Sequence, residues 1–69
     1  MMMSKLYVGN LPNDTTETNL RQLFHTNSGI VPTTIQVKRG GYAFIDCDDQ
    51  NAQDRIIDKL NGTIFLYFA

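Results

Sequence analysis

Hydrophobic and polar residues alternate in three short stretches of the chain, and a period of two is typical of half-buried strands. The stretches cover residues 5–11, 34–38 and 42–46. Residues that favour turns follow the first stretch at 12–14, and two glycines separate the second from the third. The pattern therefore predicts three strands, of which the second and third form a hairpin.

The hairpin register follows from the requirement that the apolar residues of both strands reach one core. Directly opposed residues of an antiparallel pair lie on the same face of the sheet. The apolar positions then coincide only if the loop has an odd number of residues. A three-residue loop, Arg39-Gly40-Gly41, meets this condition and offers glycine for a left-handed position. It predicts two opposed pairs on the solvent face: Lys38 with Tyr42, and Gln36 with Phe44.

Between the strands, apolar residues recur at the spacing of helices. In the first helix, Asp14 is the expected N-cap with Glu17 three residues later, and the end is expected at 27–29. In the second helix, Asp48 or Asp49 is the expected cap, and the end is expected at 61–62. The apolar stripes are Leu20, Leu23 and Phe24, and then Ala52, Ile56, Ile57 and Leu60.

This order of elements predicts an α+β fold of the ferredoxin-like, split βαβ type, with both helices on one face of a single sheet. The fold is normally completed by a fourth strand. Residues 64–68, an uncharged and β-favouring segment, are the only candidate for it. Because they follow the second helix so closely, we expect this strand to be either missing or replaced by the tail.

The length and charge of the chain restrict its function. Sixty-nine residues allow one small domain, 1–69, and a net charge of −1 requires any electrostatic site to be local. The one cysteine, Cys47, and the one histidine, His25, suggest neither a disulfide nor a metal centre. Without catalytic pairs, a signal peptide or a long apolar run, we expect a cytoplasmic or nuclear protein that is no enzyme, has no cofactor and does not bind membranes.

Three aromatic residues, Tyr7, Tyr42 and Phe44, fall on the predicted solvent face of the sheet. A base that stacks on an exposed aromatic side chain contributes about 1 to 3 kcal/mol. Aromatic residues on a sheet can instead stabilise it through cross-strand contacts, or be covered by another domain. The pattern alone leaves these interpretations open.

The segments around these residues resemble the two sequence motifs of the RNA recognition motif family, over residues 5–62. KLYVGNLP resembles the RNP2 motif, and GGYAFIDC resembles RNP1 except at Gly40, where a basic residue is usual, and at Cys47, where an aromatic residue is usual. More narrowly, NLRQLF and GYAFIDCDDQNA are similar to the first such domain of the insulin-like growth factor 2 mRNA-binding proteins.

The resemblance implies that the sheet binds single-stranded RNA, in particular mRNA, and that neighbouring domains of this type or of the KH type accompany it. Lys5 and Lys38 stand beside the aromatic residues, and Arg39 in the loop could reach a phosphate. For all three residues the alternative is a solvated edge of the sheet with no role in binding. Asp46 shares the face and is a candidate acceptor for a cytosine amino group. The candidate RNA-binding residues are Tyr7, Tyr42, Phe44, Lys5, Lys38, Arg39, Asn10 and Gln36.

Two alternatives remain at this stage. The same sheet or the helix faces could dock another protein. The region 63–69 could instead mark a truncated form that folds and binds RNA poorly. An uncovered edge of the first strand beside an uncharged tail would also favour self-association.

Overall fold

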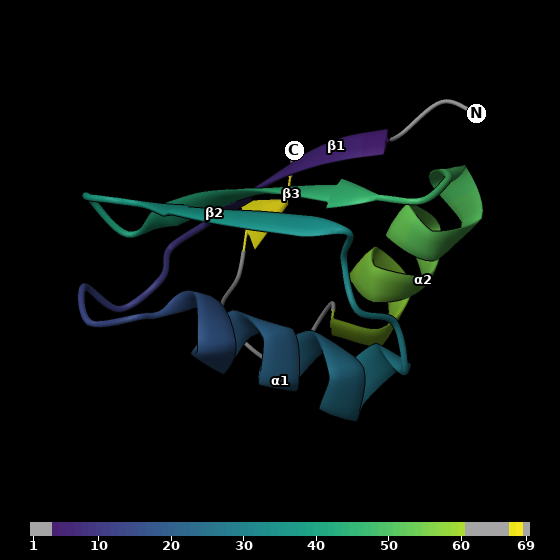
Figure 1. The fold of residues 1–69 in the computed structure, drawn as a ribbon, viewed down its shortest axis with the longest axis horizontal. Coiled ribbons are helices and arrows are strands. Elements are labelled where there is room, and N and C mark those ends of the chain that lie inside the picture. The colour runs from purple at the N-terminus through teal and green to yellow at the C-terminus, as the bar shows by residue number, and fades with distance from the viewer. Residues whose placement is uncertain (1–3, 61–66, 69) are drawn as a thin grey trace.

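A computed structural model describes residues 4–60 and 67–68 of the chain. Its elements in order are β1 (Ser4–Gly9), α1 (Glu17–Ser28), β2 (Thr34–Lys38), β3 (Tyr42–Cys47), α2 (Gln50–Leu60) and β4 (Tyr67–Phe68). The strands form one antiparallel sheet in the order β2-β3-β1-β4, and both helices lie on the same face of it (Figure 1). The α+β, ferredoxin-like fold class predicted from the sequence is therefore confirmed.

The predicted hairpin register between β2 and β3 is confirmed. Lys38 lies opposite Tyr42, and Gln36 lies opposite Phe44. The connecting turn is the expected three-residue segment 39–41, in which both glycines have positive φ, 101° for Gly40 and 79° for Gly41. The even sum of opposed residue numbers thus places the apolar residues of both strands on the helix-covered face.

Of the two predicted alternatives for the fourth strand, missing or replaced by the tail, the structure shows the second for two residues. Tyr67 and Phe68 form β4, which pairs antiparallel with β1 at Gly9 and Val8. Residues 64–66 of the expected strand lie outside the described residues, as does the helix stop expected at 61–62. Within the described part of the chain, β4 covers the edge of β1 only at these two positions.

The helix α1 begins two residues later than a cap at Asp14 would require. Its N-cap is Thr16, whose hydroxyl accepts from the backbone N–H of Asn19 at 3.1 Å, while the Asn19 side chain accepts from the N–H of Thr16 at 3.0 Å. The predicted cap at Asp14 is therefore wrong, and Glu17 pairs instead with Arg21 one turn further along the helix. The side chain of Asn19 in the third helical position accepts from the N-cap N–H as the usual Glu or Gln would, so the capping box lies at Thr16 and Asn19 without the usual acidic residue.

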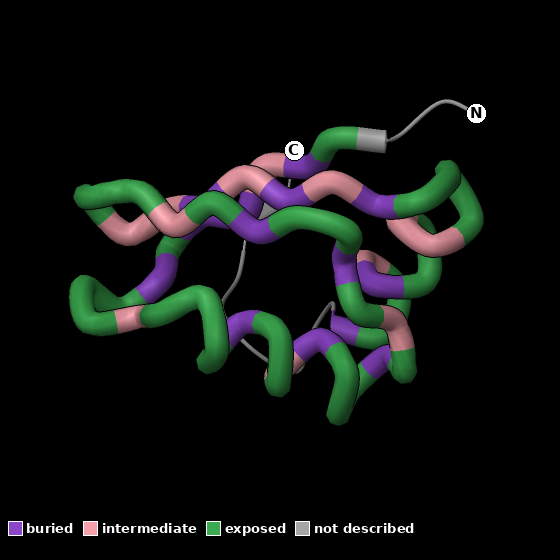
Figure 2. The backbone as a smooth tube through the Cα atoms, in the orientation of Figure 1, coloured by how far each residue is buried: buried purple, intermediate pink, exposed green. Residues whose placement is uncertain are grey.

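The core is formed by alternate residues of the strands and by one stripe of each helix, as the banding of the tube in Figure 2 shows. Of the two predicted N-cap residues of α2, Asp49 is the cap in the structure, because its carboxylate accepts from the N–H of Ala52 at 2.9 Å. Cys47 is buried in this core, and burial raises the pKa of its thiol. The buried apolar residues are Leu6, Val8, Leu11, Leu20, Phe24, Ile35, Ala43, Ile45, Cys47, Ile56 and Leu60.

Gly41 in the hairpin turn contacts the segment that follows β1. Its carbonyl accepts from the N–H of Leu11 at 2.8 Å, which holds the segment after β1 against the turn. A Cβ at Gly41 would lie 2.5 Å from the carbonyl oxygen of Leu11, and the φ of 79° is itself costly for any other residue.

Replacing Gly41 by Ala should lower the free energy of unfolding by about 3 kcal/mol, because left-handed strain and displacement of the Leu11 segment combine. The matched control is Gly29→Ala at the C-cap of α1, where φ is 75° but nothing lies within 4 Å of an added Cβ. That change should cost only about 1 kcal/mol. Urea unfolding followed by circular dichroism measures both. Equal losses in the two variants would contradict the role of the close approach.

Candidate nucleic-acid interface

Tyr7, Tyr42 and Phe44 meet on the face of the sheet that the helices leave open. Tyr7 in β1 lies opposite Phe44 in β3, and their ring centroids are 5.8 Å apart at an interplanar angle of 65°. Tyr7 and Tyr42 are stacked at 5.8 Å and 26°, while Tyr42 and Phe44 meet edge to face at 5.9 Å and 87°. All three side chains are half-buried. The rings therefore form one continuous aromatic surface, held in place by ring-to-ring contacts.

Gly9 permits this arrangement, and sequence reasoning did not assign it that role. A Cβ at Gly9 would lie 2.8 Å from both Cε1 and Oη of Tyr7, so the ring of Tyr7 lies over the strand position of Gly9. Gly9 and Tyr7 are two residues apart in β1 and share a face. A glycine two positions after an exposed aromatic residue in a strand is the signal that could have revealed it.

A row of polar side chains borders the aromatic surface. Asp46 in β3 lies opposite Lys5 in β1 and opposite Thr34 in β2. The hydroxyl of Thr34 donates to Asp46 Oδ2 at 2.6 Å, and Lys5 Nζ lies 3.5 Å from Asp46 Oδ1. The Thr34 hydrogen bond, reinforced by the charge of Lys5, holds the pKa of Asp46 below its ordinary value despite some desolvation. Asp46 is thus an ionised acceptor fixed beside the rings.

The structure brings some predicted candidates to the aromatic surface and leaves others at its rim. Lys5 lies against it, with Nζ 5.9 Å from the centroid of the Phe44 ring, although its charge is shared with Asp46. Lys38 and Gln36 are exposed and lie opposite Tyr42 and Phe44. The remaining two occupy connections: Asn10 follows β1 with a φ of 62°, and Arg39 lies in the hairpin turn.

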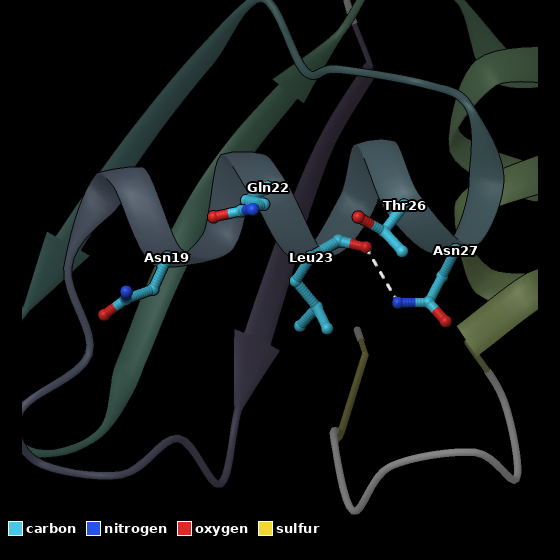
Figure 3. A pocket seen from close by; sticks show the side chains of 5 residues that line it. All are labelled: Asn19, Gln22, Leu23, Thr26 and Asn27. Atoms are coloured by element: carbon cyan, nitrogen blue, oxygen red, sulfur yellow. Dashed lines mark hydrogen bonds between the residues drawn. The ribbon is translucent and has the colours of Figure 1, made fainter.

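Among the described residues, two hollows lie on the helix side. One, of about 300 Å³, lies along α1 and is lined by polar side chains around Leu23, with the side-chain amide of Asn27 donating to the Leu23 carbonyl (Figure 3). The other, of about 260 Å³, lies beside the start of α2 and includes Asp48 and Arg55. His25 is exposed near the end of α1.

Within the described ranges, no group of three or more potential ligands could hold a metal ion. Neither described helix has the length and apolar character needed to cross a membrane.

The fold and the site define a class of protein: a small split βαβ domain with an aromatic surface on the open face of its sheet. The family model described as RNA recognition motif matches residues 6–67 of the chain. The chain belongs to this family of RNA-binding domains, which are generally non-enzymatic. The match extends past residue 62, where the sequence motifs alone had ended, and includes the first residue of β4.

Solved structures of RNA-binding proteins show the same fold. RNA binding protein PG1 is 25% identical, with a TM-score of 0.77, over 94% of this chain and 89% of that one. The RNA15 RRM is 26% identical, with a TM-score of 0.74, over 94% and 85%. The Sex-lethal RNA recognition domains 1 and 2 from Drosophila melanogaster are 30% identical, with a TM-score of 0.76, over 94% of this chain and 47% of that two-domain chain.

Replacing Thr34 by Val removes the hydroxyl that donates to Asp46 and keeps a β-branched side chain in β2. We expect the pKa of Asp46 to rise toward its ordinary value, because the carboxylate loses its main hydrogen bond. NMR titration of the Asp46 side-chain carboxyl resonance measures it. Thr34→Ser is the control, since it keeps the hydroxyl and should keep the lowered pKa.

The same change affects the pH dependence of stability. A carboxyl group whose pKa is lower in the folded state stabilises the fold above its unfolded pKa, and this contribution is lost as the pH falls through the folded pKa. The stability difference between the protein and Thr34→Val should therefore shrink on acidification below about pH 4. A constant difference, or an unchanged pKa in the valine variant, would refute the role of Thr34.

Proposed function

We propose that this domain binds single-stranded RNA by stacking bases on Tyr7, Tyr42 and Phe44. The observation that carries the proposal is the cluster of three rings, at 5.8 to 5.9 Å from one another, on the face of the sheet that no helix covers. Each ring offers a π-face, and the rings already constrain one another, so little side-chain entropy remains to be lost on stacking. Membership of the RNA recognition motif family supports the same conclusion.

The charges around the rings suggest a limited electrostatic contribution to RNA binding. Lys38 is exposed beside Tyr42, and Arg39 follows it in the turn, so both can reach phosphates of a strand that crosses the hairpin. Lys5 must break its ion pair with Asp46 before its ammonium group can bind a phosphate. Because each phosphate contact adds only about 0.7 to the salt slope for single strands, the affinity should depend weakly on salt.

The class of RNA is the finer part of the proposal. The similarity of NLRQLF and GYAFIDCDDQNA to the first domain of the insulin-like growth factor 2 mRNA-binding proteins supports mRNA as the partner and the cytoplasm as the site of action. It also supports neighbouring RNA recognition motif or KH domains in the functional assembly. Linked domains of this kind raise a modest affinity through effective concentration.

Protein docking is a second candidate function, favoured by the hollow along α1. Leu23 is half-buried there among neutral polar side chains, an arrangement that suits a small apolar contact. Self-association through β1 is a related possibility, because β4 pairs only with Val8 and Gly9 among the described residues. NMR titration separates the two functions: RNA should shift the resonances of β1 and β3, whereas a protein partner on the helix side should shift those of α1.

Phe44→Ala should weaken binding of a short single-stranded RNA between about tenfold and a hundredfold, since it removes one stacking surface. Fluorescence anisotropy with a labelled octaribonucleotide measures the affinity, and thermal unfolding checks the fold. Val31→Ala is the matched control, because Val31 is an exposed apolar residue, 42% accessible, in the connection between α1 and β2. If Phe44→Ala binds as tightly as the control while remaining folded, RNA does not stack on this sheet.

Lys38→Gln should weaken binding of every RNA sequence to a similar extent and lower the slope of log affinity against log salt by about 0.7. The reason is the loss of one phosphate contact beside Tyr42. Titrations at four salt concentrations give the slope. Lys59→Gln, in the last turn of α2 on the opposite side of the sheet, changes the net charge equally and should leave the slope unchanged. A reduced slope in both variants would indicate an effect of net charge alone.

A further inference from the structure

The polar row of Thr34, Asp46 and Lys5 lies directly beside the row that contains Phe44. In β3, Asp46 and Phe44 are two residues apart and share the open face, and the same holds for Lys5 and Tyr7 in β1. A base stacked on Phe44 therefore has its edge within reach of the Asp46 carboxylate. In the proposed function the bases are single-stranded, so their hydrogen-bonding edges are unpaired and free to contact this carboxylate.

The ammonium group of Lys5 shows what this location accepts. Its nitrogen lies 5.9 Å from the Phe44 ring centroid and 3.5 Å from Asp46 Oδ1, so a nitrogen donor over the ring is already directed at the carboxylate. Lys5 is 62% exposed and Asp46 only 20% exposed, which makes the lysine the member that can move away. A stacked base that displaces Lys5 from the ring must supply a donor to Asp46 Oδ1 in its place or leave that oxygen without its protein partner.

We propose that Asp46 makes this subsite select bases with an amino group at the ring position that faces it, N4 of cytosine and N6 of adenine, against bases with a carbonyl there, uracil and hypoxanthine, the base of inosine. This inference rests on the proposed stacking of RNA on the sheet. The 4-amino group of cytosine and the 6-amino group of adenine can donate to Asp46 in the place of the Lys5 ammonium. Uracil and hypoxanthine present a carbonyl oxygen at the same ring position, which the carboxylate repels.

The neighbours of Asp46 keep it suited to this role. Thr34 donates to Oδ2 and fixes the orientation of the carboxylate, while Oδ1 faces Lys5 and the ring. Gln36, which flanks Phe44 from β2, has both a donor and an acceptor in its amide and can satisfy either kind of base by rotating. The discrimination therefore depends on Asp46, since it is the group beside Phe44 that can only accept.

Matched pairs of nucleotides test the proposal with the full chain. We would compare labelled rU6 with rC6, and then rU6 carrying two central adenosines with the same RNA carrying two inosines, which differ from adenosine by 6-oxo in place of 6-amino. We expect about a tenfold preference for cytidine and for adenosine. Asp46→Asn should reduce both preferences to about one, because the side-chain amide can accept from an amino group or donate to a carbonyl. Asp58→Asn on α2 removes an equal charge from an exposed residue and should retain them.

The outcomes separate this inference from the proposed function. Preferences for cytidine and adenosine that Asp46→Asn abolishes and Asp58→Asn preserves support the role of Asp46. Equal affinity for both members of each pair overturns it, as do preferences that survive Asp46→Asn, whereas a loss of binding in Phe44→Ala under the same conditions would leave the proposed function intact. The adenosine and inosine comparison needs no variant, so a folding defect in Asp46→Asn cannot obscure the result. Absence of binding to all four RNAs would refute both.

Discussion

The register of β3 between β1 and β2 is the constraint on which the rest of the structure depends. Because successive side chains of a strand point to opposite faces, one choice of register decides at once which residues enter the core and which form the open face. Opposing Tyr7 to Phe44 brings Leu6 and Val8 into the core with Ala43 and Ile45. A slip of one residue would bury Tyr7 and expose Val8. The aromatic surface is thus a direct consequence of the pairing that forms the core.

On the open face of the sheet, contacts between neighbouring side chains stabilise both the aromatic rings and the charged residues. The rings contact one another at 5.8 to 5.9 Å, which keeps them half-buried in the absence of a covering layer. Beside them, Asp46 receives a hydroxyl hydrogen bond and an ammonium group, so its charge does not stand alone on the surface. Both sets of contacts lie where a ligand would bind. In the proposed function, a base stacks on the rings without breaking their mutual contacts but takes the place of Lys5 at Asp46, and this favours planar groups with hydrogen-bond donors at their edge.

The sequence predicted the features that depend on periodicity, but it did not predict those that depend on individual side-chain contacts. Alternation and the odd loop length were sufficient for the β2–β3 hairpin, and the motifs were sufficient for the three rings. The N-cap of α1 was not predicted correctly because Asp and Thr are both favourable N-cap residues. The choice of Thr16 over Asp14 depends on the hydrogen bond between the Asn19 side chain and the Thr16 N–H. The sequence left open whether β4 forms, because the path of the chain from α2 to the edge of the sheet depends on tertiary packing. The partnership of Lys5 with Asp46 required the β1–β3 register, which the hairpin argument did not supply.

That partnership also changes what the charge balance implies for binding. From the sequence, Lys5 is a candidate RNA-binding cation and Asp46 a separate candidate acceptor on the same face. In the structure the two form one pair with Thr34 at the edge of the rings, so the pair contributes little net charge to an approaching strand. What it retains is directionality: an acceptor held in place by β2 and a donor on a flexible stem from β1. In a nearly neutral domain, fixed acceptors beside a stacking surface are a means to distinguish bases that does not depend on long-range attraction.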